Sequence, residues 1–182
     1  MRRTGYGISL DVPSGWASAI LRRPVDLPEP PAGRLAEGAD VDPRSPGAGP
    51  VERTLPVVHV CTCPLPSTVG DFGGGVVESL APDDVFVALL EYGSDLAGTG
   101  LFERRGLPRL APSQFAENRM PRDVVGRSAS QHFFSHGGRA FCLFTVLGSH
   151  SRRMATVPRA AAVVRTLTIE TAATMRARGV FV

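Results

Sequence analysis

The sequence predicts an α+β fold, with a mostly antiparallel sheet of about seven strands and a C-terminal helix packed on one face. The run at 85–92 is almost continuously apolar and rich in β-branched and aromatic residues, which is typical of a central strand buried on both faces. Two segments, 130–134 and the strongly apolar 139–147, flank a pair of glycines suited to a tight hairpin turn. A helical segment follows, with Thr156 as the expected N-cap and Pro158 in the first turn.

Length and composition predict a single domain that spans residues 1–182. The hydrophobic fraction of 43% and the charged fraction of 20% are ordinary for a globular protein that can fill a core. No stretch approaches the roughly 20 apolar residues of a membrane helix, and no apolar run follows the two N-terminal arginines as in a signal peptide. We therefore expect a soluble, cytoplasmic protein without a membrane segment.

All of the 20 basic residues are arginine. Arginine codons are rich in G and C, so this usage, with the abundant glycine, proline and alanine, indicates a GC-rich genome and a bacterial origin. The formal net charge is only +3, and many arginines occur in scattered pairs, such as those at 104–105 and 152–153. A nucleic-acid-binding protein concentrates its basic residues on one face. The sequence therefore argues against a nucleic-acid partner.

The N-terminal elements are expected to form a hairpin. Residues 7–12 alternate apolar and polar side chains, a Pro-Ser-Gly turn follows, and residues 16–22 have the pattern of a returning strand. Residues 24–50 then contain seven prolines and four glycines, with too few apolar side chains to offset the entropy of ordering them. We predict a mobile insertion at 24–50 within the domain.

The remaining elements follow in chain order. The sequence predicts a β-branched strand at 56–63, a short helix or turn between residues 69 and 80, and a loop-rich stretch at 93–127. After the C-terminal helix, residues 166–169 alternate and predict a last short strand. The tail at 171–182 is expected to pack loosely.

The two most apolar strands, 85–92 and 139–147, are expected to lie at the centre of the sheet. Alternation puts Phe141 and Phe144 on opposite faces of the second of these strands. Both faces should be buried, one under the C-terminal helix and the other under loops or a second layer. We expect Phe86 or Phe144 to contact the helix.

The two ends of the chain resemble the PsbP-like superfamily. An opening strand is followed by Val12-Pro13-Ser14-Gly15-Trp16, and Gly138-Arg139-Ala140-Phe141 opens the return strand of a hairpin that leads to a helix and short strand at 157–169. This superfamily includes the photosystem II extrinsic protein, the Ran-binding nuclear import factor and bacterial effector chaperones. Its members share no catalytic residues. The resemblance therefore implies a binding or adaptor role, with no site residues to transfer.

His59, Cys61 and Cys63 fall at alternate positions of one predicted strand and so share a face. An imidazole with two thiolates suits Zn²⁺, which normally takes four ligands. On a straight strand the outer two lie about 13 Å apart, too far for metal–sulfur bonds of roughly 2.3 Å to one ion, and Cys142 could join only from an adjacent strand. We therefore expect packing rather than metal binding. Cys61 and Cys63 are also too close on a strand to pair comfortably, so no structural disulfide is expected.

Other motifs do not define a site. Asp71-Phe72-Gly73 matches the metal-binding motif of kinases, but this chain has no lysine, and kinases require one. The glycines at 73–75 likewise lack the lysine of a phosphate-binding loop, and Asp83-Asp84 suits a solvated turn as well as a cation. The four histidines are dispersed, and no nucleophile motif is present. We therefore assign no catalytic, cofactor-binding or metal-binding residue.

The leading functional hypothesis is a non-enzymatic protein-binding or adaptor domain, chaperone-like in character. It would recognise another protein through a sheet face or through its long loops. The alternative is a small-molecule or metal-dependent enzyme whose site is assembled only in three dimensions. A deep cleft with converging His, Asp, Glu or Arg side chains would favour the enzyme. A shallow surface with an exposed aromatic patch would favour the adaptor.

Overall fold

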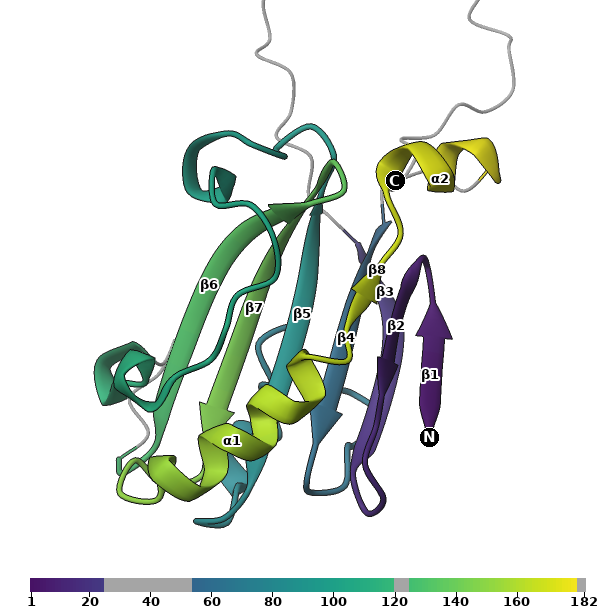
Figure 1. The fold of residues 1–182 in the computed structure, drawn as a ribbon. Helices are drawn as coiled ribbons and strands as arrows, with labels where there is room; N and C mark the ends of the chain where they lie inside the picture. Colours follow the sequence, from purple (N-terminus) through teal and green to yellow (C-terminus); the bar gives the residue numbers. More distant parts are fainter. Residues whose placement is uncertain (25–53, 120–124, 180–182) are drawn as a thin grey trace, which may run out of the picture.

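The structure of the protein is a computed structural model, and it describes residues 1–24, 54–119 and 125–179 (Figure 1). The strands are β1 (Arg2–Gly5), β2 (Ile8–Asp11), β3 (Ala17–Pro24), β4 (Thr54–Cys61), β5 (Val85–Gly93), β6 (Ser128–His136), β7 (Arg139–Leu147) and β8 (Thr168–Ile169). The helices are α1 (Arg153–Val164) and α2 (Ala172–Ala177), and the 3-10 helices are η1 (Val77–Ser79), η2 (Gly100–Phe102), η3 (Pro112–Gln114) and η4 (Glu117–Arg119). The predicted α+β class with antiparallel strands is confirmed.

Five strands form the main sheet in the order β3-β4-β5-β7-β6, and every neighbouring pair is antiparallel. β5 lies in the middle, and all of its residues except Tyr92 are buried, because both faces of the sheet are covered. β6 and β7 form a hairpin that turns at Gly137 and Gly138, where φ is 59° and 78°. Both values are positive, as a tight two-residue turn requires. The predictions of a central strand and of this hairpin are confirmed.

Three strands form a second sheet in the order β1-β2-β8, so the expected single sheet of about seven strands is wrong. The expected N-terminal hairpin is also wrong. β2 pairs with β1 through a turn at Tyr6 and Gly7, where φ is 52° and 71°, while β3 pairs with β4 in the main sheet. The sequence does not reveal β1 because three of its four residues are exposed and the fourth is glycine, so no apolar alternation marks the strand.

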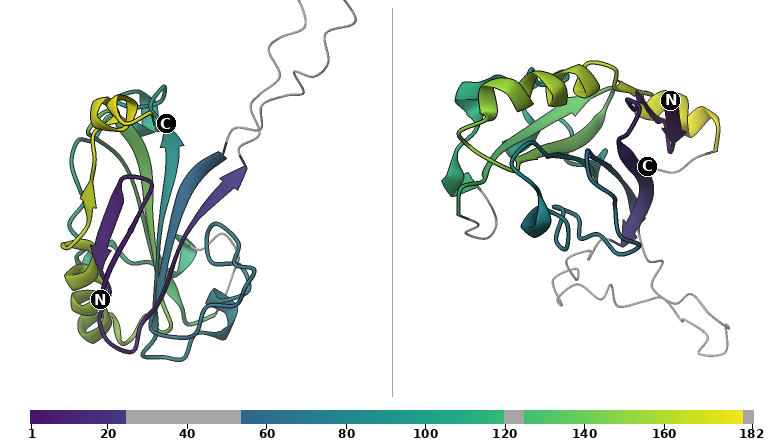
Figure 2. Two further views of the ribbon diagram at one scale, coloured as in Figure 1. Left: turned by 90° about the vertical axis from the view of Figure 1, so that its right-hand side faces the viewer. Right: turned by 90° about the horizontal axis from the view of Figure 1, so that it is seen from below.

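Helix α1 and the small sheet lie on the same side of the main sheet (Figure 2). The apolar stripe of α1 joins the core formed by β2, β5 and β7 through Val157, Ala160, Val163 and Val164. The helix begins at Arg153, so Thr156 is not its N-cap; the Thr156 hydroxyl instead donates to the backbone carbonyl of Arg152, the N-cap residue. Pro158 lies inside the helix rather than in its first turn. It is exposed, so water can satisfy the carbonyl group that loses its donor.

The opposite face of the main sheet is covered by the segment 63–80, which connects β4 to β5 and contains η1 (Figure 2). Val77 and Leu80 of this segment share a core with Phe86 and Phe144. The expectation that Phe86 or Phe144 contacts the helix is therefore wrong, because alternation along β5 and β7 directs both rings away from α1. The broader expectation that both faces of β7 are buried is confirmed.

Two predictions concern segments that the structure describes only in part. The insertion predicted at 24–50 lies outside the described residues, except for Pro24, which ends β3. The tail at 171–182 is predicted to pack loosely. Over its described part, however, Thr171 caps α2 and Met175 is buried, because this helix packs beside the turn between β1 and β2. No helix in the described ranges is long and apolar enough to cross a membrane.

Candidate functional site

The segment 94–119, which connects β5 to the chain before β6, covers the β6 edge of the main sheet. It is held to this edge at two points. Near one end, the Ser135 N–H donates to Arg104 O at 2.7 Å, and near the other end Ala116 and Ala129 exchange backbone hydrogen bonds of 3.1 and 3.0 Å. Between these points the segment extends over the face that α1 covers, and its apolar side chains join that core. The segment thus satisfies part of an edge that would otherwise present unpaired backbone groups.

A groove of about 500 Å³ lies between this segment and the C-terminal half of α1. Its lining residues are Leu107, Pro108, Arg109 and Leu110 from the segment, with Ala161, Val164 and Arg165 from the helix and its C-cap. Leu107 and Leu110 are only partly buried against the core, so part of their apolar surface faces the groove. Arg109 and Arg165 are exposed. We call this feature, with its apolar floor and two arginines, the basic groove.

The two arginines of the basic groove carry unneutralised charge. Neither Arg109 nor Arg165 makes a side-chain hydrogen bond or an ion pair with any residue that the structure describes. Some other exposed arginines are paired, as Arg178 is with Glu170 at 2.8 Å, whereas Arg176 is exposed and, within the described part of the chain, unpaired like the two groove residues. The potential over the groove is therefore positive, and an anion that enters it meets two guanidinium groups free to bind it.

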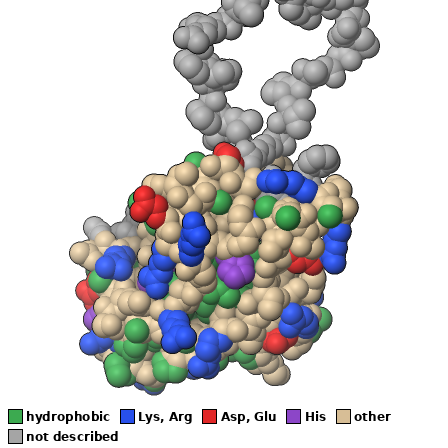
Figure 3. Space-filling model, turned by 45° about the horizontal axis from the view of Figure 1, so that its top comes forward, with side chains coloured by type: hydrophobic (Ala, Val, Ile, Leu, Met, Phe, Trp, Pro, Cys, Tyr) green, Lys and Arg blue, Asp and Glu red, His purple; other side chains and the backbone are tan. Residues whose placement is uncertain are grey.

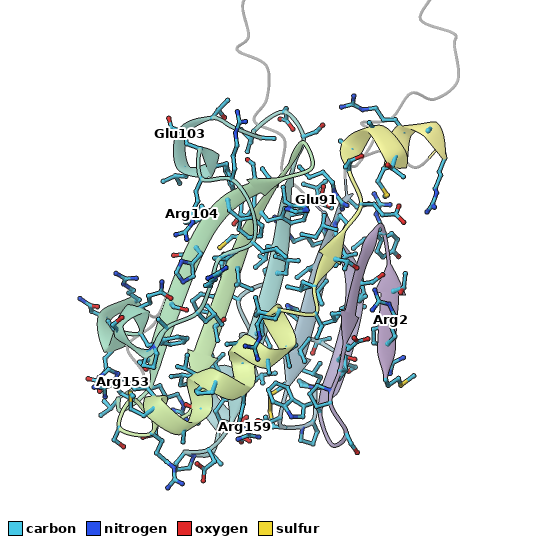
Figure 4. All side chains as sticks on the ribbon, in the orientation of Figure 1. Arg2, Glu91, Glu103, Arg104, Arg153 and Arg159 are labelled. Atoms are coloured by element: carbon cyan, nitrogen blue, oxygen red, sulfur yellow. A yellow bond between two sulfur atoms is a disulfide. The ribbon has the colours of Figure 1, made fainter. Side chains whose placement is uncertain are left out.

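Further arginines lie on the same segment. Figure 4 shows Arg104 beside β6, and Arg105 follows it in the chain. On the face viewed in Figure 3, blue arginine side chains are more widespread than red acidic ones. Sequence reasoning treated the 104–105 pair as scattered charge and did not single out Arg109 or Arg165. These two residues are brought together only by the packing of α1 against the segment.

A second hollow, of about 310 Å³, lies between residues 97–106 and the β6–β7 turn. Arg105, Ser135 and His136 contribute side chains to it, and glycines contribute most of the rest. The Ser135 hydroxyl already donates to Phe102 O at 2.7 Å. Neither this hollow nor the basic groove has an Asp or Glu among its described lining residues. Neither therefore supplies the carboxylate of a general acid–base pair.

On the face covered by α1, β6 and β7 carry a row of buried polar side chains. Ser128, Ser130 and Thr145 are fully buried, and Ser130 lies directly opposite Thr145 in the strand register. Their hydroxyls and Nε2 of His132 have no hydrogen-bond partner among the described residues. Burial, together with the charges of two nearby arginines, lowers the pKa of His132. The row therefore offers neutral polar groups of the kind that ordered water normally satisfies.

His59 lies in β4 on the opposite face, where it is buried with 1% of its surface exposed. Its Nε2 lies 3.0 Å from Asp71 O, its ring centroid lies 5.4 Å from that of Phe86, and Nδ1 has no partner among the described residues. Burial lowers the pKa of His59, and the hydrogen bond to Asp71 and the charge of its carboxylate oppose this shift. Because the net shift is downward, the folded protein favours a neutral imidazole.

We expect the free energy of unfolding to decrease as the pH falls below 6.5, the ordinary pKa of histidine. The unfolded chain takes up a proton there that the folded environment of His59 disfavours. The contribution of His59 to the free energy of unfolding is complete above the unfolded-state pKa and is lost as the pH falls towards the lower folded-state pKa. His132, whose pKa is also lowered, acts in the same direction. Urea unfolding from about pH 8 to about pH 5 measures the slope. His59→Gln should reduce this slope, and an unchanged slope in His59→Gln would contradict this account.

Cys61 and Cys63 form a disulfide, so the expectation that they do not pair is wrong. That expectation extended the strand through Cys63, whereas β4 ends at Cys61 and the following turn brings the two Cα atoms to 5.1 Å, within the range that a disulfide spans.

Cys142 is a buried free thiol, and burial raises its pKa to about 11. Within the described ranges, no group of three or more His, Cys, Asp and Glu side chains could hold a metal ion.

The other motifs noted in the sequence have roles within the fold. Asp71 lies 3.4 Å from Arg23 in an ion pair. Gly73 has a φ of 82°, and a Cβ at this position would lie 2.6 Å from the Phe86 ring, so close packing accounts for the glycine. In the Asp83-Asp84 pair, the first carboxylate pairs with an arginine and the second accepts hydrogen bonds from a threonine hydroxyl and a backbone N–H.

Comparisons with known proteins identify no relative. No protein-family model matches the chain, and no curated protein or solved structure gives a significant match to it. The PsbP-like resemblance of the two ends therefore stays a prediction.

Proposed function

We propose that the protein is a non-enzymatic binding domain whose basic groove holds an acidic segment of a partner protein. The main support for this proposal is that the groove combines an apolar floor with two exposed, unpaired arginines, Arg109 and Arg165. An apolar side chain of the partner would fill the floor, and acidic side chains on either side of it would meet the arginines. Guanidinium groups bind carboxylates through paired, charge-assisted hydrogen bonds.

The walls of the basic groove are held in place by the fold. The segment 94–119 forms backbone hydrogen bonds to β6 on both sides of the residues that line the groove, and α1 is anchored through its buried apolar stripe. A preformed groove loses little conformational entropy when a ligand binds, so more of the contact energy appears as affinity. This arrangement suits recognition by a rigid surface rather than by a loop that must first become ordered.

The chemistry of the groove also favours binding over catalysis. Its described lining contains arginines and apolar side chains but no histidine, cysteine, serine or carboxylate, and these are the usual nucleophiles and acid–base groups. The binding or adaptor role implied by the PsbP-like resemblance is of the same class. The enzyme alternative has no comparable supporting observation.

The proposal predicts selective binding of acidic, apolar peptides. The probe is a fluorescein-labelled peptide of alternating glutamate and leucine, and its counterpart has glutamine in place of every glutamate. Fluorescence anisotropy should show binding of the first peptide and much weaker binding of the second. The double variant Arg109→Gln/Arg165→Gln should weaken binding of the acidic peptide about tenfold, equivalent to about 1.4 kcal/mol.

The matched control is Arg176→Gln, because Arg176 is also an exposed arginine, but on α2, away from the groove (Figure 1). It should leave the affinity unchanged. Affinity should also fall with added salt, since exposed charges are screened. Equal losses in the control and the double variant would mean that net charge, not the groove, attracts the peptide. That result, or equal binding of the two peptides, would contradict the proposal.

A further inference from the structure

The disulfide between Cys61 and Cys63 lies in a turn that other bonds already hold. The residue between them, Thr62, donates its backbone N–H to Val85 O at 3.1 Å, and its hydroxyl accepts from Val85 N at 2.9 Å. The same hydroxyl donates to Asp84 Oδ1 at 2.7 Å. These three hydrogen bonds fasten the turn to the start of β5 without any contribution from sulfur. The turn can therefore keep its shape when the disulfide is reduced.

The disulfide is also poorly suited to stabilise the fold. A disulfide stabilises a protein mainly by restricting its unfolded chain, and this effect grows with the length of the loop that it closes. Here the loop contains one residue between the two cysteines. Closing so short a loop restricts the unfolded chain very little. A role other than stabilisation is needed to explain why two cysteines are paired here.

The two sulfur-bearing residues differ in exposure. Cys61 is fully buried, whereas Cys63 is only partly buried. Cys63 is thus the more exposed end of the disulfide, and we take its sulfur as the one that an incoming thiolate attacks. The Cys63 backbone N–H donates to Cys61 Sγ at 3.2 Å. This hydrogen bond is placed to stabilise negative charge on Cys61 Sγ as it becomes the leaving group.

We propose that Cys61 and Cys63 form a reversible redox pair that exchanges with an external dithiol. One thiolate of the dithiol attacks Cys63 Sγ; the bond between Cys63 and Cys61 breaks, and its electron pair goes to Cys61 Sγ. This step leaves a mixed disulfide between the reductant and Cys63. The second thiol of the reductant then attacks the reductant sulfur in that mixed disulfide, and the bond to Cys63 Sγ breaks, which releases Cys63 as a thiolate. The reductant becomes a disulfide, two electrons pass to the protein, and the two thiol protons end on Cys61 and Cys63.

The third cysteine lies too far away to interfere. Cys142 pairs with Leu90 in the register of β5 and β7, while Cys61 pairs with Phe86 in that of β4 and β5. The two positions along β5 are four residues apart, or about 13 Å at the rise of a strand. Burial also raises the pKa of Cys142 to about 11, which suppresses its thiolate. Exchange is thus confined to one pair, and this inference is independent of the basic groove.

The test is a redox titration of the full-length protein. The protein is equilibrated in reduced and oxidised glutathione buffers that span the range of reducing and oxidising compartments, then quenched with acid, alkylated and weighed by mass spectrometry. Two cysteines should convert together, with the midpoint inside this span, and Cys142→Ala should leave the midpoint unchanged. The oxidised and reduced forms should have the same circular dichroism spectrum and nearly the same thermal midpoint.

Single-cysteine variants test the direction of attack. In a Cys142→Ala background, Cys63 in Cys61→Ser should react with a chromogenic disulfide reagent at least about tenfold faster than Cys61 does in Cys63→Ser, because Cys63 is the more exposed of the two. Equal rates would overturn the assigned order of attack. A pair that stays oxidised across the whole span, or whose reduction unfolds the protein, would show a structural disulfide and overturn the proposal. Failure of the two cysteines to oxidise together would overturn it as well.

Discussion

Replacing Arg139 with methionine is expected to lower the free energy of unfolding by about 3–5 kcal/mol, because it leaves a buried carboxylate without its counter-ion. Arg139 and Glu91 are each fully buried, with Nε to Oε1 at 2.8 Å and Nη2 to Oε2 at 2.5 Å. The guanidinium also donates to Tyr6 O at 3.1 Å and Glu170 O at 3.2 Å. It therefore bonds the main sheet to the turn between β1 and β2 and to the residue after β8. Figure 4 shows Glu91 near the upper end of β5.

Two comparisons isolate the cause of this loss. The double variant Arg139→Met/Glu91→Leu removes both charges, so it should be more stable than Arg139→Met alone. Recovery should be incomplete because Tyr6 O and Glu170 O still lack their donor. Arg2→Met breaks an ion pair whose two side chains are about half exposed, and it should change stability by about 1 kcal/mol or less. Urea unfolding measures all three, and similar losses in Arg139→Met and Arg2→Met would contradict the account.

The parts of the fold that were predictable are those with a local signal. The run at 85–92 is apolar throughout, and the glycines at 137 and 138 provide the positive φ of a hairpin turn. The ion pair of Arg139 and Glu91 has no such signal. Arg139 was noted only within a short motif, and its partner lies 48 residues earlier in the chain. The pairing becomes visible only once β5 is known to lie beside β7, which the composition of neither strand specifies.

The candidate sites were less predictable than the fold for a similar reason. The basic groove joins Arg109, in an irregular segment, to Arg165, at the end of a helix, and no spacing rule connects them. The disulfide was missed through a boundary error. Extending β4 by two residues places Cys61 and Cys63 on one straight strand, whereas ending it at Cys61 allows the chain to turn and the sulfurs to meet. Strand ends depend on tertiary packing as well as on local propensity.

Truncating Phe144 is the second change expected to have a large effect. Its ring is 1% exposed, lies opposite Ala88 in the register with β5, and contacts Phe72 edge-on with centroids 5.3 Å apart. The ring therefore bridges the centre of the main sheet and the segment that covers its second face. Phe144→Ala would remove this contact and leave a cavity between β7 and the segment 63–80. We expect a loss of about 3–5 kcal/mol, a large part of the ~5–15 kcal/mol stability of an ordinary domain.

The outcome distinguishes a central strand from a peripheral one. Phe144→Ala should unfold the protein or leave it barely stable by urea or thermal unfolding, whereas Phe144→Leu, which keeps most of the volume, should cost clearly less. Arg152→Ala breaks only an ion pair with Asp83 in which both side chains are more than half exposed, so its cost should be about 1 kcal/mol or less. If Phe144→Ala kept the stability of the unmodified protein, the segment 63–80 would not pack on β7. The layer that this segment forms on the main sheet would then contribute little to the stability of the fold.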